Sequence, residues 1–142
     1  MSLQQLTDVR ISDLMIDSEL VAHVQVNNPL EHALLVLVKS GYSAVPVLDE
    51  KFKLVGTISK TAILNEMLGL ERFEVEKLAN FIVRDVMKTD IPKLKKEDRL
   101  IDGLKAVINA PFVCIVDDEG YLDGILTRRN ILKQLKRDYY TN

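Results

Sequence analysis

The sequence predicts an α/β protein made of two copies of one unit, each with the element order β-α-β-β-α, arranged about a pseudo-two-fold axis. Two observations predict this fold: four sequence segments recur in the same order, and the same series of apolar patterns follows in each half. The chain has 142 residues, the length of one compact module. Hydrophobic residues are 47% and charged residues 28%, as in ordinary globular proteins.

The repeat is visible as four pairs of matching segments. ISDLM at 11–15 returns as VRDVM at 83–87, and Leu34 and Leu37 correspond to Leu104 and Val107. VPVLD at 45–49 matches VCIVD at 113–117, and GTISKTAI at 56–63 matches GILTRRNI at 124–131. Four matches in one order indicate a duplication. We therefore predict a first repeat at 8–70, a linker helix at 71–82 and a second repeat at 83–139.

Apolar periodicity and turn residues predict the elements of each copy. In the first copy they are an extended segment at 22–26, a helix at 30–40, strands at 44–48 and 54–59, and a helix at 60–68. In the second copy they are an extended segment at 91–94, a helix at 99–109, strands at 112–116 and 121–127, and a helix at 128–137. Residues 71–80 are expected to be helical.

The last helix of each copy carries more apolar positions than one repeat needs. We interpret this surplus as a homodimer contact, although a fuller core within one chain explains it equally well. The positions are Ile63, Leu64, Met67, Leu68, Ile131, Leu132 and Leu135.

Charge and cysteine content narrow the class of protein. The formal net charge is −2 and the pI about 5.7, which argues against nucleic acid as the main partner. The first ten residues do not resemble a signal peptide, and the longest apolar run, 33–38, is too short to cross a membrane. A single cysteine suits a reducing compartment. We expect a cytoplasmic protein.

The residues offer no catalytic or metal-binding constellation, so we expect no enzyme activity, catalytic residue, metal or cofactor. His23 and His32 are the only histidines, and we interpret them as structural rather than as a metal pair. Cys114 lies in an apolar strand and is expected to be an inert core thiol.

The strand-to-helix junctions are the most informative segments. Thr127, Arg128, Arg129 and Asn130 open a helix directly after an apolar strand. A helix N-terminus attracts anions, and arginine matches phosphate oxygens in bidentate geometry. The alternative is that both arginines are solvated or paired with surface acids such as those at 117–118.

At the first junction the equivalent residues are Ser59, Lys60, Thr61 and Ala62. Lys60 could hold a phosphate weakly, whereas Ala62 has no polar group. The two junctions are therefore predicted to be unequal.

These junctions, together with GYSAVPV at 41–47, resemble the cystathionine β-synthase (CBS) repeat over nearly the whole chain. In that family two repeats form clefts for adenosine-containing ligands, and an Asp after the motif Ser/Thr holds the ribose. Here that Asp is replaced by Ala62 and by Asn130. Asn130 can still hydrogen-bond a ribose, but Ala62 cannot.

A narrower resemblance rests on VAHVQV at 21–26, LEHALLVL at 30–37, GLER at 69–72, TDIP at 89–92 and TRR at 127–129. These stretches look like the small two-repeat CBS receptors for cyclic di-AMP of Gram-positive bacteria. The resemblance implies a cleft between the repeats, with phosphodiesters at Thr127, Arg128 and Arg129 and ribose at Asn130. Adenine is expected in an apolar slot, for which we select Val21, Ala22, Tyr42, Ser43, Ala44 and Pro46.

The resemblance also implies regulation of a partner protein. Family targets include the synthetase/hydrolase of the guanosine alarmones and pyruvate carboxylase, and nothing in the residues selects between them. Three alternatives stay open at this point: a sensor of AMP, ADP or ATP, a nucleotide-independent interaction module, and a nucleic-acid binder.

Overall fold

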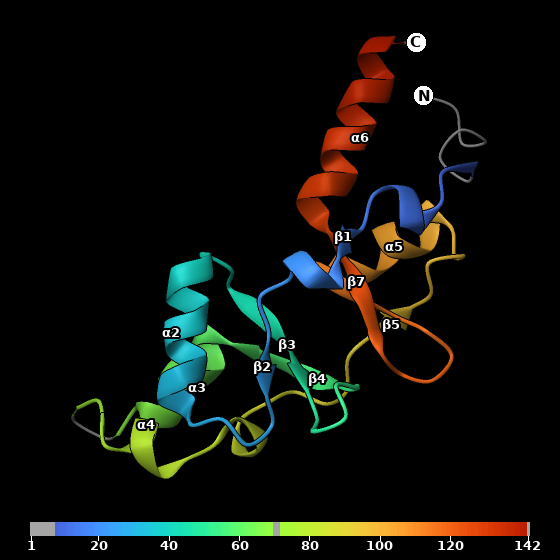
Figure 1. The fold of residues 1–142 in the computed structure, drawn as a ribbon. Coiled ribbons are helices and arrows are strands. Elements are labelled where there is room, and N and C mark those ends of the chain that lie inside the picture. Colours follow the sequence, from blue (N-terminus) through green and yellow to red (C-terminus); the bar gives the residue numbers. More distant parts are fainter. Residues whose placement is uncertain (1–7, 70–71, 142) are drawn as a thin grey trace. The chain divides into compact units, whose positions relative to one another are not determined.

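The computed structural model describes residues 8–69 and 72–141, and the chain forms two compact units (Figure 1). The central unit consists of residues 22–91, and the terminal unit combines residues 1–21 with 92–142. These units do not coincide with the two halves of the duplicated sequence. Each unit holds the strands and helices of one copy together with the leading segment of the other copy.

The central unit is a three-stranded sheet with helices on one face. Its sheet order is β2-β3-β4, with β2 parallel and β4 antiparallel to β3. The elements are β2 (Val24–Gln25), α2 (Leu30–Ser40), β3 (Ala44–Leu48), β4 (Leu54–Ser59), α3 (Lys60–Met67), α4 (Lys77–Asn80) and η3 (Val83–Asp85).

The terminal unit repeats this plan and adds an edge strand from the N-terminal segment. Its sheet order is β1-β7-β6-β5, with β5 parallel to β6 and the other pairs antiparallel. The elements are η1 (Ile11–Asp13), β1 (Ile16–Asp17), η2 (Ser18–Leu20), β5 (Lys93–Leu94), α5 (Leu100–Ala106), β6 (Phe112–Val116), β7 (Leu122–Thr127) and α6 (Arg128–Thr141).

The predicted α/β fold with two β-α-β-β-α copies is confirmed, and the bounds of α2, β3, β4 and β6 agree with the expectation. Two helices differ. Helix α5 ends earlier because the carbonyl oxygens of Val107 and Ala110 accept hydrogen bonds from an arginine side chain instead of from helical N–H groups. Within 71–80 only Lys77–Asn80 is helical, since the Glu74 N–H pairs with the carbonyl of Met67. Glu71 lies outside the described residues.

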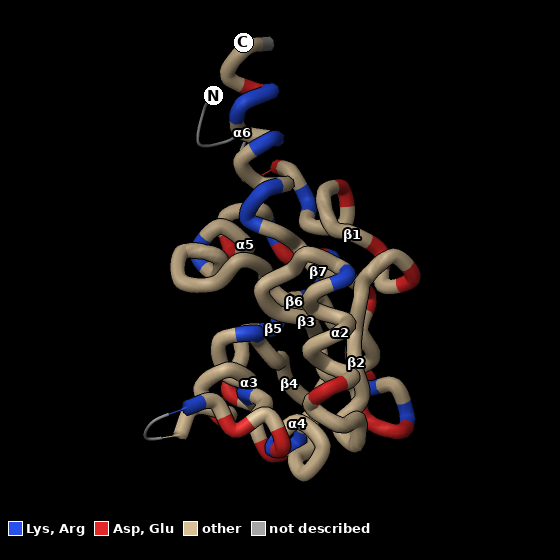
Figure 2. Tube along the Cα trace, turned by 90° about the vertical axis from the view of Figure 1, so that its left-hand side faces the viewer, with Lys and Arg blue, Asp and Glu red and all other residues tan. Residues whose placement is uncertain are grey.

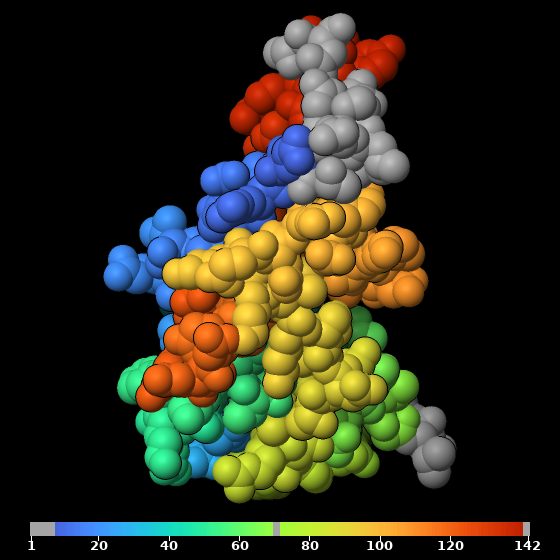
Figure 3. Space-filling model, turned by 90° about the vertical axis from the view of Figure 1, so that its right-hand side faces the viewer, coloured from blue at the N-terminus to red at the C-terminus, as the bar shows by residue number. Residues whose placement is uncertain are grey.

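The leading segments of the two copies are exchanged between the units. In the central unit, the first N–H of α2, on Leu30, donates to the carbonyl of Phe81, and Val83 donates to Asn28. The terminal unit makes the equivalent bonds with the other leading segment, from Leu100 to Val9 and from Ile11 to Asp98. Figure 3 shows the blue N-terminal segment against the yellow and orange residues that follow 92. The side chains of Ile11 and Val83 are fully buried, so each exchanged segment completes a core.

The glycines of the two repeat motifs leave the space that these segments occupy. A Cβ on Gly56 would collide with the carbonyl oxygen of Lys88, and one on Gly124 would collide with that of Ile16. Thr57 and Lys88 exchange backbone hydrogen bonds of 2.9 and 2.8 Å, and β1 pairs with β7 at Gly124. A backbone lying this close leaves no room for a side chain.

Each unit has its own hydrophobic core, and these cores use part of the apolar surplus on the last helices. Ile63, Met67 and Ile131 are buried in them and Leu135 packs partly against one. The other apolar positions are exposed: Leu64 at 41%, Leu68 at 57% and Leu132 at 54%. These three leucines are what is left for a contact with a second copy, and the homodimer stays a prediction.

Candidate functional site

The two strand-to-helix junctions share one backbone frame. At the first, Ser59 Oγ accepts the Ala62 N–H at 3.0 Å; at the second, Thr127 Oγ1 accepts the Asn130 N–H at 3.0 Å. The helices α3 and α6 are thus both capped by the motif hydroxyl. The first N–H of each helix is also taken, by the carbonyl of residue 43 at 3.0 Å and that of residue 111 at 2.9 Å. The first and third N–H groups of each helix are therefore already paired, and we expect side chains to supply most of any anion binding there.

The Arg128 side chain is held by the protein itself. Its Nε donates to the carbonyl oxygen of Val107 at 2.9 Å, and its Nη2 donates to that of Ala110 at 3.0 Å. Both carbonyls lie at the C-terminal end of α5, where the helix dipole favours a cation. Arg128 therefore closes the end of α5, and this contact positions the first turn of α6.

The Arg129 side chain is exposed and available. Within residues 8–69 and 72–141 its guanidinium makes no hydrogen bond or ion pair. The acids considered as its partners are otherwise engaged. Asp118 pairs with Lys95, and Asp117 Oδ1 accepts the backbone N–H groups of Glu119 and Tyr121. Arg129 has its whole guanidinium available to an incoming anion, whereas Arg128 has two donor atoms committed to carbonyl oxygens.

Asn130 lies half-buried behind the arginines, in the first turn of α6. Its Nδ2 donates to the carbonyl oxygen of Leu14 at 3.1 Å. A carbonyl can only accept, so this bond fixes which end of the amide faces the N-terminal segment. The Oδ1 atom remains as an acceptor for a ligand hydroxyl. Ala62, at the same place in α3, offers neither group.

The predicted apolar slot maps mostly to the central unit. In β3, Val45 and Val47 point into the core against α2 and α3. Ala44 and Pro46 alternate with them and therefore lie on the opposite face of the sheet. Ala44 is half-buried and Pro46 is buried. A small residue and a proline leave this face shallow and apolar, as an adenine ring requires.

The remaining slot residues lie beside this strand or at the unit boundary. Ala22 and Tyr42 are half-buried against the central core, whereas Ser43 is exposed and gives its carbonyl to the Lys60 N–H. Val21 is buried and is the last residue of the terminal unit's first segment. The structure thus groups five slot residues in the central unit and the four junction residues in the terminal unit.

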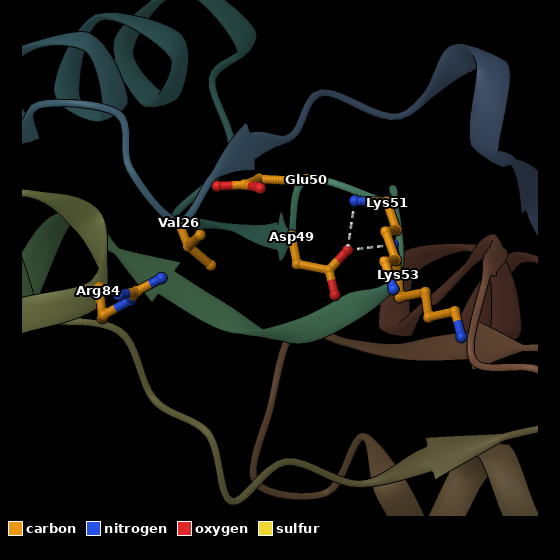
Figure 4. A pocket seen from close by; sticks show the side chains of 6 residues that line it. All are labelled: Val26, Asp49, Glu50, Lys51, Lys53 and Arg84. Carbon is orange, nitrogen blue, oxygen red and sulfur yellow. Dashed lines mark hydrogen bonds between the residues drawn. The ribbon is translucent and has the colours of Figure 1, made fainter.

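Two polar features were not singled out from the sequence. One is a surface pocket of the central unit, in which Asp49 Oδ1 accepts the backbone N–H groups of Lys51 and Lys53 at 2.8 and 3.0 Å (Figure 4). The pocket is lined by Val26, Asp49, Glu50, Lys51, Lys53 and Arg84. The other is Asp123 Oδ2, buried without a hydrogen-bond partner among the described residues. Neither feature includes a predicted site residue.

The nucleophile and metal candidates have no reactive geometry. Cys114 is buried in β6, and burial raises the pKa of its thiol to about 12, so it stays protonated at neutral pH. His23 and His32 are both exposed. Among the residues described, no three His, Cys, Asp or Glu side chains are grouped as metal ligands. Nor does any described helix combine the length and apolarity that a membrane span needs.

The duplicated fold, the motif glycines and the hydroxyl-capped junctions define a paired-repeat module. The CBS domain profile matches residues 11–69 and 83–137. The chain belongs to the CBS domain family, as its junction motifs predicted.

Three similar proteins narrow the comparison. Cyclic di-AMP receptor B of Bacillus subtilis (strain 168) is 50% identical over 133 residues, covering 94% of this chain and 90% of that protein. The crystal structure of the CbpB protein of Listeria monocytogenes in complex with c-di-AMP is 48% identical with a TM-score of 0.85, covering 93% and 98%. A CBS domain-containing protein of Bacillus anthracis is 55% identical with a TM-score of 0.90, covering 96% and 99%.

The predicted resemblance to small two-repeat CBS receptors for cyclic di-AMP is therefore confirmed. Relatives of this chain include named receptors of that nucleotide. The individual ligand contacts predicted for this chain stay predictions.

Proposed function

We propose that this protein is a cytoplasmic receptor that binds cyclic di-AMP and controls a partner protein. The observation that carries the proposal is that the two neighbouring arginines have different surroundings. Arg128 is held on the end of α5, whereas Arg129 is exposed and free of contacts within the described residues. A rigidly mounted helix turn that presents one uncommitted guanidinium is suited to a phosphodiester.

The chemistry of the ligand fits the residues available. Cyclic di-AMP has two phosphate charges and two adenine rings, so it needs cations beside an apolar slot. Arg129 supplies the positive charge, and Asn130 Oδ1 supplies an acceptor for a ribose hydroxyl. Ala44 and Pro46 supply shallow apolar surface. The similarity to the Bacillus subtilis receptor and to the Listeria monocytogenes complex supports the same ligand.

Control of a partner is the second half of the proposal. If the ligand-free form binds a target and the nucleotide releases it, each must weaken the other's binding by the same factor. The resemblance points to the synthetase/hydrolase of the guanosine alarmones or pyruvate carboxylase as targets.

Calorimetric titration of the wild-type chain with cyclic di-AMP, AMP, ADP and ATP tests the ligand. We expect cyclic di-AMP to bind most tightly. Tighter binding of ATP, ADP or AMP would replace the proposal with a sensor of linear adenine nucleotides. No binding of any of the four would leave a nucleotide-independent interaction module.

A further inference from the structure

Helix α6 carries a concentration of positive charge that extends beyond the proposed nucleotide site. Its 14 residues include five basic side chains and one acid, a formal charge of +4 in a chain whose net charge is −2. The blue bands along α6 in Figure 2 follow the helix well past its first turn. The rest of the chain is therefore clearly acidic, and the positive charge of α6 is local.

The cations lie on one side of the helix. At about 100° per residue, Arg129, Lys133, Lys136 and Arg137 fall within an arc of roughly 100° that also contains Tyr140. All five side chains are exposed. Asp138, the one acid of α6, lies on the opposite side and accepts a hydrogen bond from Gln134 at 2.9 Å. We call these four cations and Tyr140 the basic stripe.

The core of the terminal unit does not need this part of α6. Ile131 and Leu135 pack into that core, and no described residue beyond Leu135 belongs to it. Tyr139 and Tyr140 are 71% and 75% exposed. The last turns of α6 extend past the sheet of the terminal unit (Figure 1).

The residues beside the stripe favour a protein partner. Leu132 and Tyr139, both more than half exposed, border it on one side. Arginine and tyrosine are enriched in protein–protein interfaces, and here they lie beside an exposed leucine. A membrane-surface helix would need its apolar face free, but Ile131 and Leu135 are occupied by the core. A nucleic acid would meet the field of a net acidic chain.

We propose that the basic stripe docks an acidic helical segment of a partner protein, and that a nucleotide held by Arg129 withdraws one cation from it. The second clause rests on the proposed function. Arg129 and Arg137 are two turns apart, about 12 Å along the helix. Glutamates four residues apart on a partner helix repeat at the same spacing as Arg129, Lys133 and Arg137. Arg129 is the first residue of the stripe and also the proposed phosphate ligand, which couples the two events.

The test uses the full chain and a fluorescein-labelled helical peptide with four glutamates spaced by four residues and one leucine. The control peptide replaces each Glu with Gln. We expect the acidic peptide to bind at least tenfold more tightly than the Gln peptide at low salt. The double variant Lys133→Glu with Lys136→Glu should lose at least tenfold in affinity, because each exposed ion pair contributes up to about fivefold and reversal adds repulsion. The matched variant Lys39→Glu with Lys51→Glu, equally charged and in the central unit, should change it less than twofold.

Equal affinity of the two peptides, or equal losses in the two double variants, would overturn the docking surface. So would tighter binding of a single-stranded RNA or of anionic phosphatidylserine vesicles than of the acidic peptide. Saturating cyclic di-AMP should weaken peptide binding severalfold, and an unchanged affinity overturns the coupling. Both double variants should bind cyclic di-AMP like the wild type. If cyclic di-AMP fails to bind while the peptide results hold, the proposed function fails and the docking surface stands.

Discussion

The two junctions have the same backbone and different chemistry. Ser59 and Thr127 make the same 3.0 Å cap, and the first N–H of each following helix reaches the equivalent carbonyl. Yet one helix continues with Lys60 and Ala62, and the other with two arginines and Asn130. The first residues of β3 and β6 differ in the opposite sense: Ala44 is small, whereas its counterpart Phe112 is large. The duplication has kept the backbone frame in both units, while the small Ala44 lies in the central unit and the paired arginines lie in the terminal unit.

The shared frame depends on the exchanged segments, and removing one should have the largest effect. A fragment spanning 8–70 follows the sequence repeat but lacks Val83, which is fully buried in the central core. A fragment spanning 22–91 contains the whole central unit. We expect the 22–91 fragment to unfold cooperatively on heating, measured by circular dichroism, and the 8–70 fragment to show no transition. A cooperative transition in the 8–70 fragment would show that the leading segments are dispensable.

The two neighbouring arginines are expected to affect different properties: Arg128 the stability of the fold, and Arg129 the binding of the ligand. Arg128→Ala removes two hydrogen bonds that a charged guanidinium donates. The carbonyl oxygens of Val107 and Ala110 then lose this donor. We expect this substitution to lower the free energy of unfolding by about 1–3 kcal/mol. Arg129→Ala, the matched control, should change it by less than about 0.5 kcal/mol. Urea unfolding of both variants checks this, and equal losses would mean that Arg128 is not the structural one of the pair.

Strands β3 and β6 differ at the equivalent positions Pro46 and Cys114, and this difference gives the smallest effect. The thiol pKa is about 12 in the folded chain against an ordinary value of 9.0. Its contribution to stability is therefore complete below about pH 9 and is lost as the pH rises from there toward 12. At pH 10 we expect the wild type to have lost about 1 kcal/mol more than Cys114→Ala, relative to pH 8. Identical pH profiles of unfolding would show that the thiol ionises equally easily in both states.

The sequence predicted the elements whose signals are local. The apolar run of α2 ends at Gly41, which adopts a positive φ of 77°, and β3 and β4 flank a turn built on Asp49. It did not predict the exchange of leading segments, because β1 and η3 have only two and three residues and no periodicity of their own. The sequence also did not predict that Arg128 is hydrogen-bonded while Arg129 is not, because this depends on where α5 ends, which is a tertiary feature. The extent of the basic stripe was missed because α6 was expected to end at Arg137.

The central claim is that Arg129, rather than the shared frame, gives the module its affinity for a dianionic nucleotide. Calorimetry with cyclic di-AMP on the wild type, Arg129→Ala and the matched Lys60→Ala measures this directly. A charge-assisted hydrogen bond contributes roughly 1.5–3 kcal/mol, so Arg129→Ala should weaken binding about ten- to a hundredfold. Lys60→Ala should change it less than threefold. Wild-type affinity in a folded Arg129→Ala variant, or a larger loss in Lys60→Ala, would contradict the account.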